Sequence, residues 1–330
     1  MDWARILSDG LHFGLGPLGA AFALAAVGLN LQFGYTGLLN FGQSGFAAVG
    51  AYGLAIAVVS LHLPFAVAIL VALLASTVLA LLLGIPTLRL RGDYLAIVTI
   101  AAAEIIRLVA QATNFRTVTG GADGLQGFSD TFRSLNPFGD GEYGIWRVQF
   151  REDELWPMLV GWVLVVLACL LVRAAIRSPW GRVLKAIRED EDAVRSLGKS
   201  VTLYKLQSLM VGGAFGAMAG IMQALAEGSA TPTNFATGAT FQFYAMVILG
   251  GTATVWGPVL GAILINFLLQ ASSQFLVEAN DSFIPSSLIS DDDVGAVRFM
   301  LMGLVIMLLM VFRPQGLVGD RREAAVNVRR

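Results

Sequence analysis

Residues 155–176 read LWPMLVGWVLVVLACLLVRAAI, and the residues that follow, 177–205, read RSPWGRVLKAIREDEDAVRSLGKSVTLYK. The first stretch is apolar over the length of about 20 residues that a helix needs to cross the hydrocarbon core of a membrane. The second stretch is densely charged, and a further long apolar run follows it. This alternation predicts two membrane-spanning helices joined by a charged, helix-prone segment that a soluble protein can bind from one side of the membrane.

The composition of the whole chain agrees with a membrane protein. Of its 330 residues, 56% are hydrophobic and 14% are charged, and the mean hydropathy is +0.71. A soluble domain has about 25% charged residues, so lipid is the expected solvent. Open sheets leave backbone groups unsatisfied in lipid, whereas helices do not. The sequence therefore predicts an all-α fold, a polytopic transmembrane helical bundle that forms one domain over residues 1–330.

The apolar runs predict about nine membrane spans, with a range of eight to ten because Gly or Pro interrupts several of them. The runs lie near 15–33, 38–60, 63–84, 93–112, 155–176, 205–226, 234–251, 255–277 and 296–313. Basic residues mark the cytoplasmic side of a membrane protein. Of the 22 Lys and Arg residues, 14 lie in the loop 89–91, the segment 177–205 and the tail from residue 313. We therefore expect the C-terminus in the cytoplasm and the loop 113–154 on the opposite side.

The loop 113–154 is rich in turn-forming residues. It contains TGGADGLQGF at 119–128 and NPFGDGEYG at 136–144. Gly and Asn tolerate a positive φ, and Pro presets the geometry of a turn, so this composition predicts tight turns. A loop of this length usually has a function, such as capping a pathway or binding a partner.

Residues 182–198 carry an amphipathic pattern. Apolar residues at helical spacing alternate with charges, which predicts one or two short helices, and Gly198 is expected to end the last of them in a left-handed cap. An ordinary cytoplasmic loop would contain the Arg and Lys residues but not the acidic run 189–192. We therefore favour a docking element whose apolar stripe fits a groove in a partner and whose charges fix the register. The candidate docking residues are Arg182, Lys185, Arg188, Glu189, Glu191, Ala193 and Gly198.

Residues 193–200, AVRSLGKS, nearly match a phosphate-binding loop, with Ala in place of its first Gly. Such a loop requires a buried strand before it, whereas a charged helical pattern precedes residue 193. The chain also has two His residues and one Cys residue, too few for an ordinary His/Cys metal site. We therefore expect neither ATP hydrolysis by this chain nor a metal site.

Few ionisable or polar residues lie within the apolar runs. Glu104 and Arg107 are one turn apart on the fourth run and so share a helix face. Ionisable residues inside spans usually have a function, but we favour a structural pair near the outer interface, where Arg can reach water. Other polar groups in or beside the runs are Asn30, Asn40, Gln43, Ser44 and Asn266. Each can hydrogen-bond a passing solute or, as we expect for any single one, a neighbouring helix.

Two Gly-rich breaks interrupt membrane-length apolar regions, one in each half of the chain. They read GYTGLLNFGQSGF at 34–46 and GGTATVWGPVLG at 250–261. Paired breaks point to the pathway of a transporter, but glycine also serves close helix packing, and we give the two interpretations equal weight. The candidate pathway or gate residues are Gln43, Ser44, Glu104, Arg107, Gly250, Gly251 and Trp256.

Seven sequence blocks, in order over residues 20–318, resemble one known family. The blocks are GYTGLLNFGQSGF (34–46), LRLRGDYLAIVTIAAAEIIR (88–107), TGGADGL (119–125), GRVLKAIREDEDAVRSLG (181–198), YKL (204–206), ILGGTATVWGPVLGA (248–262) and RPQGL (313–317). Each block alone is a weak signal, and seven in the same order are a strong one. The chain is similar to the permease subunits of ABC importers for branched-chain amino acids, of the LivM type.

The resemblance implies a multi-pass protein of the bacterial inner membrane, surrounded by lipid. Its partners would be a second, LivH-like permease, two cytoplasmic ATPase subunits and a periplasmic substrate-binding protein, and no nucleic acid. Residues 181–198 then resemble the coupling region that such permeases seat in a cleft of the ATPase. Glu191, Ala193 and Gly198 loosely match the Glu-Ala-Ala…Gly motif of importer permeases, although the spacing differs. This chain would bind no cofactor itself, because ATP and Mg²⁺ would lie on the ATPase subunits.

Three alternatives remain open at this point. Closely similar permeases carry urea or short amides, and the quoted blocks do not separate these solutes from leucine-like ones. An ion-coupled secondary transporter or a channel working alone is the second alternative, and the scarcity of ionisable residues in the spans argues against it. A membrane-embedded enzyme is the third, and it would need clustered His, Cys or paired carboxylate residues that the sequence does not contain.

Overall fold

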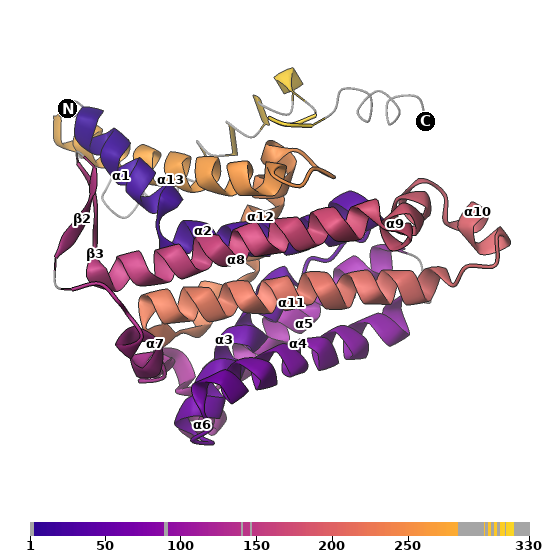
Figure 1. Ribbon diagram of the computed structural model, residues 1–330, viewed down its shortest axis with the longest axis horizontal. Helices are drawn as coiled ribbons and strands as arrows, with labels where there is room; N and C mark the ends of the chain where they lie inside the picture. The colour runs from indigo at the N-terminus through magenta and orange to yellow at the C-terminus, as the bar shows by residue number, and fades with distance from the viewer. Residues whose placement is uncertain are drawn as a thin grey trace.

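The computed structural model describes residues 3–88, 92–139, 141–145 and 147–282, together with residues 300, 303–304, 307–308, 311–313 and 315–319. Long helices that run side by side make up most of this part of the chain (Figure 1). The helices of the bundle and of its charged end are α1 (Trp3–Leu15), α2 (Pro17–Asn30), α3 (Gln43–Val59), α4 (Phe65–Thr87), α5 (Gly92–Gln111), α8 (Glu152–Arg177), α9 (Pro179–Glu189), α10 (Glu191–Ser196), α11 (Val201–Glu227), α12 (Thr237–Gly250) and α13 (Gly257–Ser282). The prediction of an all-α, polytopic bundle is confirmed.

The predicted count of nine spans is not confirmed. Within the described part of the chain, six helices are long and apolar enough to cross a membrane: α2 with its extension to Tyr35, α4, α5, α8, α11 and α13. Two further runs form shorter helices, because α3 has 17 residues and α12 has 14. The predicted run 296–313 lies largely outside the described residues.

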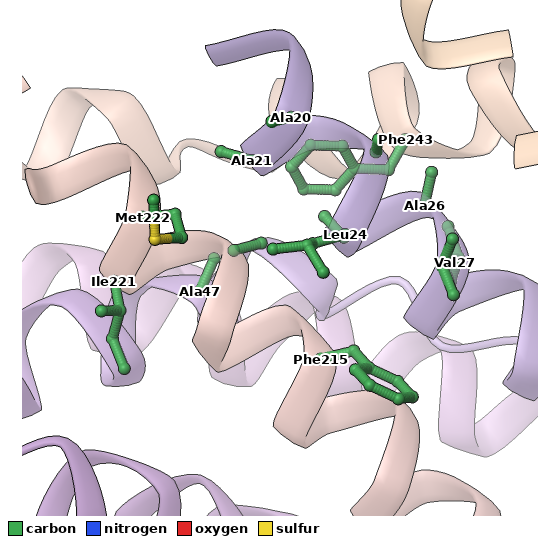
Figure 2. Packing of buried hydrophobic residues seen from close by; sticks show 14 of the residues in the cluster. Ala20, Ala21, Leu24, Ala26, Val27, Ala47, Phe215, Ile221, Met222 and Phe243 are labelled. Atoms are coloured by element: carbon green, nitrogen blue, oxygen red, sulfur yellow. The ribbon is translucent and has the colours of Figure 1, made fainter. Parts of the chain in front are cut away.

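Helix α2 lies at the centre of the bundle. In its span, 83% of the residues are buried, compared with 22% in α4 and in α5. Figure 2 shows Leu24 of α2 among side chains of α3, α11 and α12, which include Ala47, Met222 and Phe243. The buried side chains of α2 are mostly small, namely Ala20, Ala21, Ala23, Ala25 and Ala26. Small residues let neighbouring backbones approach, which is how helices pack without a hydrophobic driving force in lipid.

Glycines bring α3 and α11 into direct backbone contact. A Cβ atom on Gly50 of α3 would lie 2.1 Å from the carbonyl oxygen of Ala217, and one on Gly220 of α11 would lie 1.9 Å from that of Ala47. Any larger residue at these two positions would separate the helices. Together with α2, these helices form the rigid centre against which the other helices pack.

The loop 113–154 lies at the end of the bundle opposite α9 and α10 (Figure 1). Its elements are η2 (Thr113–Phe115), α6 (Arg116–Thr119), η3 (Gly121–Asp123), β1 (Leu125–Gln126), α7 (Asp130–Ser134), β2 (Glu142–Ile145) and β3 (Val148–Arg151). Strand β2 pairs antiparallel with β3, and β1 pairs antiparallel with β4 (Ser229–Ala230), which follows α11 and precedes η4 (Pro232–Phe235). The tight turns predicted at 119–128 are confirmed by positive φ angles at Gly120, Gly121, Gly124 and Gly127.

Candidate functional site

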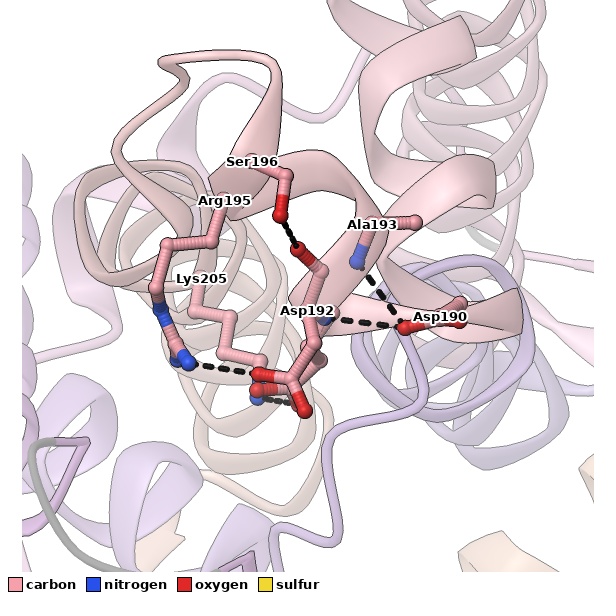
Figure 3. A network of polar contacts seen from close by, with 7 residues as sticks. Asp190, Asp192, Ala193, Arg195, Ser196 and Lys205 are labelled. Carbon is pink, nitrogen blue, oxygen red and sulfur yellow. Dashed lines mark hydrogen bonds and ion pairs between the residues drawn. The ribbon is translucent and has the colours of Figure 1, made fainter.

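Residues 179–196 form two short helices, α9 and α10, at one end of the bundle (Figure 1). Asp190 separates them with an extended backbone, and its Oδ1 accepts hydrogen bonds from the N–H groups of Asp192 and Ala193 at 2.9 and 3.0 Å (Figure 3). An Asp in this position satisfies N–H groups that the first turn of a helix leaves unpaired. Gly198 has a φ of +74°, so the predicted left-handed conformation is confirmed.

The apolar stripe of α9 and α10 is buried within this chain. Leu184, Ile187 and Val194 are at most 5% exposed, and the last two pack with Val201 at the start of α11. The prediction that the stripe fits a groove in a partner is therefore wrong for these three residues. Leu197, by contrast, is 79% exposed. A helical period of apolar residues shows that one face is buried but not which protein buries it.

The predicted docking residues divide into an outward and an inward group. Arg188 and Glu191 are half-buried and bind within the chain. The Nη1 of Arg188 donates to the carbonyl oxygen of Gly34 at 2.5 Å, and Glu191 forms an ion pair with Lys205 of α11. The outward group, whose members are exposed, consists of Arg182, Lys185, Glu189, Ala193 and Gly198.

The first Gly-rich break starts with a π-helical turn, η1 (Leu31–Tyr35), which continues α2. Such turns often mark functional sites in helices. The chain then leaves the helix, with Gly37 at a φ of +74°, and α3 begins at Gln43. A Cβ atom on Gly37 would lie 3.3 Å from Cγ of Arg188, so the break lies directly against α9.

The two Gly-rich breaks contact each other. The Oδ1 of Asn30 accepts from the N–H group of Ala253 at 3.0 Å, and its Nδ2 donates to the carbonyl oxygen of Thr254 at 2.8 Å. A Cβ atom on Gly34 would lie 2.6 Å from the backbone nitrogen of Ala253, so glycine is needed for the close approach of the two backbones. The breaks therefore form one junction, which we define as residues 30–37 together with 251–254.

Gly250 and Gly251 serve close packing beside this junction. A Cβ atom on Gly250 would lie 1.8 Å from the carbonyl oxygen of Gly257 in α13. Gly251 has a φ of +117°, which excludes most other residues. The N–H group of Leu317 donates to the carbonyl oxygen of Leu249 at 2.9 Å, so the chain after residue 313 returns to this point. Trp256, which lies within the break and directly before α13, is 41% exposed.

Gln43 and Ser44 are fully buried between helices. The Nε2 of Gln43 donates to the carbonyl oxygens of Ala25 and Gly212 at 3.3 and 3.1 Å. The backbone N–H group of Ser44 donates to Oγ1 of Thr240 at 2.9 Å. These bonds join α2, α3, α11 and α12, so both residues act as the interhelical contacts that we expected of any single polar residue in the spans.

The Glu104–Arg107 pair lies on α5, at the edge of the bundle. The Nη2 of Arg107 is 2.5 Å from Oε1 of Glu104, and its Nε donates to both carboxylate oxygens at 3.1 and 3.0 Å. The Nη1 of Arg107 donates to Oε1 of Gln111 at 3.1 Å. The side chains of Arg107 and Glu104 are 18% and 37% exposed, so the charges lie on a face of α5 that this chain leaves partly uncovered.

Two polar residues of this region, Gln32 and Lys205, were not among the predicted site residues. Gln32, in η1, is fully buried; its Nε2 donates to the carbonyl oxygen of Leu209 at 3.2 Å, and its Oε1 accepts from Asn40 at 2.8 Å. Lys205 pairs with Glu191, although its side chain is only 10% exposed. The available signal was the same for both, namely a polar residue inside or at the start of an apolar run.

The phosphate-loop pattern at residues 193–200 has no strand before it, because α9 precedes α10. The pattern therefore does not form a nucleotide site of that kind. Among the residues that the structure describes, no group of three or more His, Cys, Asp or Glu side chains could hold a metal ion.

Comparison with known proteins identifies the family. Residues 15–313 match the family model described as "Branched-chain amino acid transport system / permease component". The chain is 32% and 31% identical to the high-affinity branched-chain amino acid transport system permease proteins LivM of Salmonella typhimurium and Escherichia coli, over 96% of this chain and 72% of each relative. It is 24% identical to a probable LivM of Methanocaldococcus jannaschii, over 94% of this chain and 92% of the relative. This multi-pass membrane protein therefore belongs to the family of permease components of branched-chain amino acid transport systems.

Proposed function

We propose that this chain is the permease subunit of an ATP-driven ABC importer that moves branched-chain amino acids handed over by a periplasmic binding protein. A second, LivH-like permease and two cytoplasmic ATPase subunits complete the importer, and ATP and Mg²⁺ bind to the ATPase subunits rather than to this chain. The observation that carries the proposal is the exposed, charged end formed by α9 and α10 in a chain of this family. This end lies opposite the loop 113–154, as a contact site for a cytoplasmic motor requires (Figure 1).

The outward group of docking residues would contact the ATPase. Charges of both signs, such as Arg182 and Glu189, fix the register of a partner and exclude wrong partners. Closure of the ATPase dimer on ATP would then move α9 and α10 and shift the bundle between outward-open and inward-open states. The ATPase needs no contact with the solute for this mechanism to work.

The exposed face of α5 would line the solute pathway, opposite the second permease. At a rise of about 1.5 Å per residue, Glu104 lies roughly 4 Å from the midpoint of α5, within the hydrocarbon core of a membrane. Charged groups at this depth almost always face water or protein, because contact with lipid costs several kcal/mol. Glu104 and Arg107 are therefore better accommodated beside a water-filled pathway than in lipid.

The C-terminus would lie on the cytoplasmic side, together with α9 and α10. Residues 317 and 318 bond the backbone of Leu249 and Gly250, beside the junction that Arg188 contacts. The basic residues of the tail, such as Arg321 and Arg322, agree with this side.

Uptake into vesicles tests this function. Vesicles would contain this chain alone, or this chain with its co-purifying subunits, with and without internal ATP and the binding protein, and would receive labelled leucine or labelled urea. We expect leucine uptake in the complete, ATP-supplied system. Urea uptake under the same conditions would support the proposed mechanism but would replace branched-chain amino acids with urea as the solute. Uptake by the chain alone, driven by an ion gradient, would overturn the proposal.

The docking residues can be tested in the same vesicles. Ala193→Arg places a large charge at an exposed position of α10, and Glu189→Lys reverses an exposed charge on α9. We expect both variants to insert normally and to uncouple ATP hydrolysis from uptake, so that ATP is hydrolysed with little leucine taken up. Normal uptake by both variants would contradict the docking assignment.

A further inference from the structure

Arg188, a residue of the predicted docking set, contacts the junction by a hydrogen bond. Its side chain is 23% exposed and points toward the bundle, where Nη1 donates to the carbonyl oxygen of Gly34 at 2.5 Å. Arg182, two turns earlier on the same helix, is exposed and reaches the carbonyl oxygen of Arg177 at 3.4 Å. The two arginines of α9 therefore have different surroundings, one inside the chain and one outside it.

The Gly34 carbonyl is a suitable acceptor for an arginine. It lies in the last turn of η1, where helical carbonyls have no following N–H group to bond. A guanidinium supplies a charge-assisted hydrogen bond with fixed geometry, which is stronger than a bond between neutral groups. The aliphatic part of Arg188 also lies within 3.3 Å of the position that a Cβ atom on Gly37 would occupy. Arg188 therefore holds the chain at the end of η1, by a hydrogen bond to Gly34 and by packing against Gly37.

A displacement of Gly34 must reach the second break. Its backbone lies against Ala253, and Asn30 bonds Ala253 and Thr254 with both ends of its amide. The packing at this point is close, since a Cβ atom on Gly34 would lie 2.1 Å from Oδ1 of Asn30. A shift of α9 toward or away from the bundle would therefore move residues 30–37 and 251–254 together.

We infer that Arg188 is a positioning residue that transmits the movement of α9 to the junction, and that it does not contact the ATPase. The inference rests on the proposed function, because the movement of α9 is attributed there to the ATPase. Lys185 adds a weaker contact to the same turn, with Nζ 5.8 Å from the centre of the Tyr35 ring. Arg182 has no such contact with η1 and serves as the matched control on the same helix.

The test compares Arg188→Ala, Arg188→Lys and Arg182→Ala in the complete importer in vesicles. Three quantities are measured for each: the amount of ATPase that co-purifies with this chain, the rate of ATP hydrolysis, and the leucine taken up per ATP hydrolysed. For Arg188→Ala we expect normal co-purification and hydrolysis, with leucine per ATP lowered about tenfold, the size of effect that one charged hydrogen bond can give. Arg188→Lys, which keeps a donor and the charge, should restore much of this ratio.

The control distinguishes transmission from docking. Arg182→Ala should lower the amount of ATPase that co-purifies with this chain, a quantity that Arg188→Ala is expected to leave normal. If Arg188→Ala shows this docking pattern, or if its leucine per ATP equals that of the unaltered chain, the inference is overturned. If Arg188→Ala does not accumulate in the membrane, Arg188→Gln, which keeps one amide donor, is measured against Arg188→Lys with the same criterion. Failure of the unaltered importer to take up leucine would instead overturn the proposed function, so the two failures are separable.

Discussion

Helices α4 and α5 are equally uncovered by the rest of the chain, yet their outer faces differ in kind. In each span 22% of the residues are buried. The exposed face of α4 is apolar and carries Leu70, Leu74, Val78 and Leu82. The face of α5 carries Glu104, Arg107 and Gln111 beside apolar residues. Exposure in a single membrane chain therefore does not identify its surroundings, whereas the chemistry of the exposed side chains does: α4 is suited to lipid and α5 to water or protein.

The largest expected effect is on membrane insertion. Leu74 of α4 and Ile97 of α5 are both 64% exposed, and Ile97 lies two turns before Glu104 on the same helix face, so Leu74→Arg and Ile97→Arg are matched substitutions. An Arg near the middle of a lipid-facing helix costs about 3 kcal/mol for insertion. We expect Leu74→Arg to lower the amount of folded, membrane-inserted protein strongly, and Ile97→Arg to lower it far less. Equal losses, measured as protein extracted in folded form by mild detergent, would show that both faces contact lipid.

Thiol labelling gives the next largest expected difference. Cys169 is the only cysteine and is buried, so a Cys169→Ala background can carry a single new cysteine. We expect Ala101→Cys on α5 to react with a charged, membrane-impermeant thiol reagent about tenfold or more faster than Leu74→Cys on α4, because the reactive thiolate forms in water and not in lipid. The labelling rates in the assembled importer are the measurement. Similar rates for both cysteines would show that the exposed faces of α4 and α5 do not differ in their contact with water.

A moderate effect is expected from Glu104→Gln. If α5 faces water, the unpaired Arg107 stays solvated and the free energy of unfolding changes by about 1 kcal/mol or less. If α5 faces lipid, the uncompensated charge costs about 3–5 kcal/mol. We expect the small change in stability together with an uptake rate several-fold lower, in line with a pathway residue. The charge-swapped double variant Glu104→Arg with Arg107→Glu should recover stability in unfolding measurements.

The smallest effect on uptake and stability is expected from a substitution in the Arg116–Asp123 pair of the loop 113–154. The Nη2 of Arg116 lies 2.9 Å from Oδ2 of Asp123, and the two side chains are 66% and 77% exposed. Exposed ion pairs contribute about 0–1 kcal/mol. Asp123→Asn should leave uptake and the thermal midpoint nearly unchanged. A large loss of either would mean that the outer loop has a charge-dependent contact outside this chain.

Much of the architecture could be predicted from the sequence because lipid restricts the choices. Apolar runs of sufficient length and a helical pattern at 182–198 are local signals, and within the described residues six long apolar helices and the helices α9 and α10 agree with them. The direction of the apolar stripe on α9 and α10 was not predictable, because burial in this chain and burial in a partner produce the same spacing at Ile187 and Val194.

The junction was predictable in part. Glycine-rich breaks at 34–46 and 250–261 indicated two places where helices are interrupted, but the contact between them depends on residues far apart in the chain. Asn30 and Ala253 are 223 positions apart, and the Glu191–Lys205 pair depends on how α10 folds back on α11. No periodicity specifies such pairs, since they arise from tertiary packing.

Helix α11 connects the two ends of the bundle and can transmit a movement from one end to the other. Its first turns hold α10 through Lys205, and only Gly228 separates its last residue, Glu227, from β4, which pairs with β1 of the loop 113–154. A straight helix of this length spans about 40 Å, and it does not bend easily between its ends. If α9 and α10 bind the ATPase as proposed, a tilt of α11 imposed at that end would also displace the loop 113–154, so that a binding protein seated on that loop would sense the state of the ATPase without any change in the solute pathway between them.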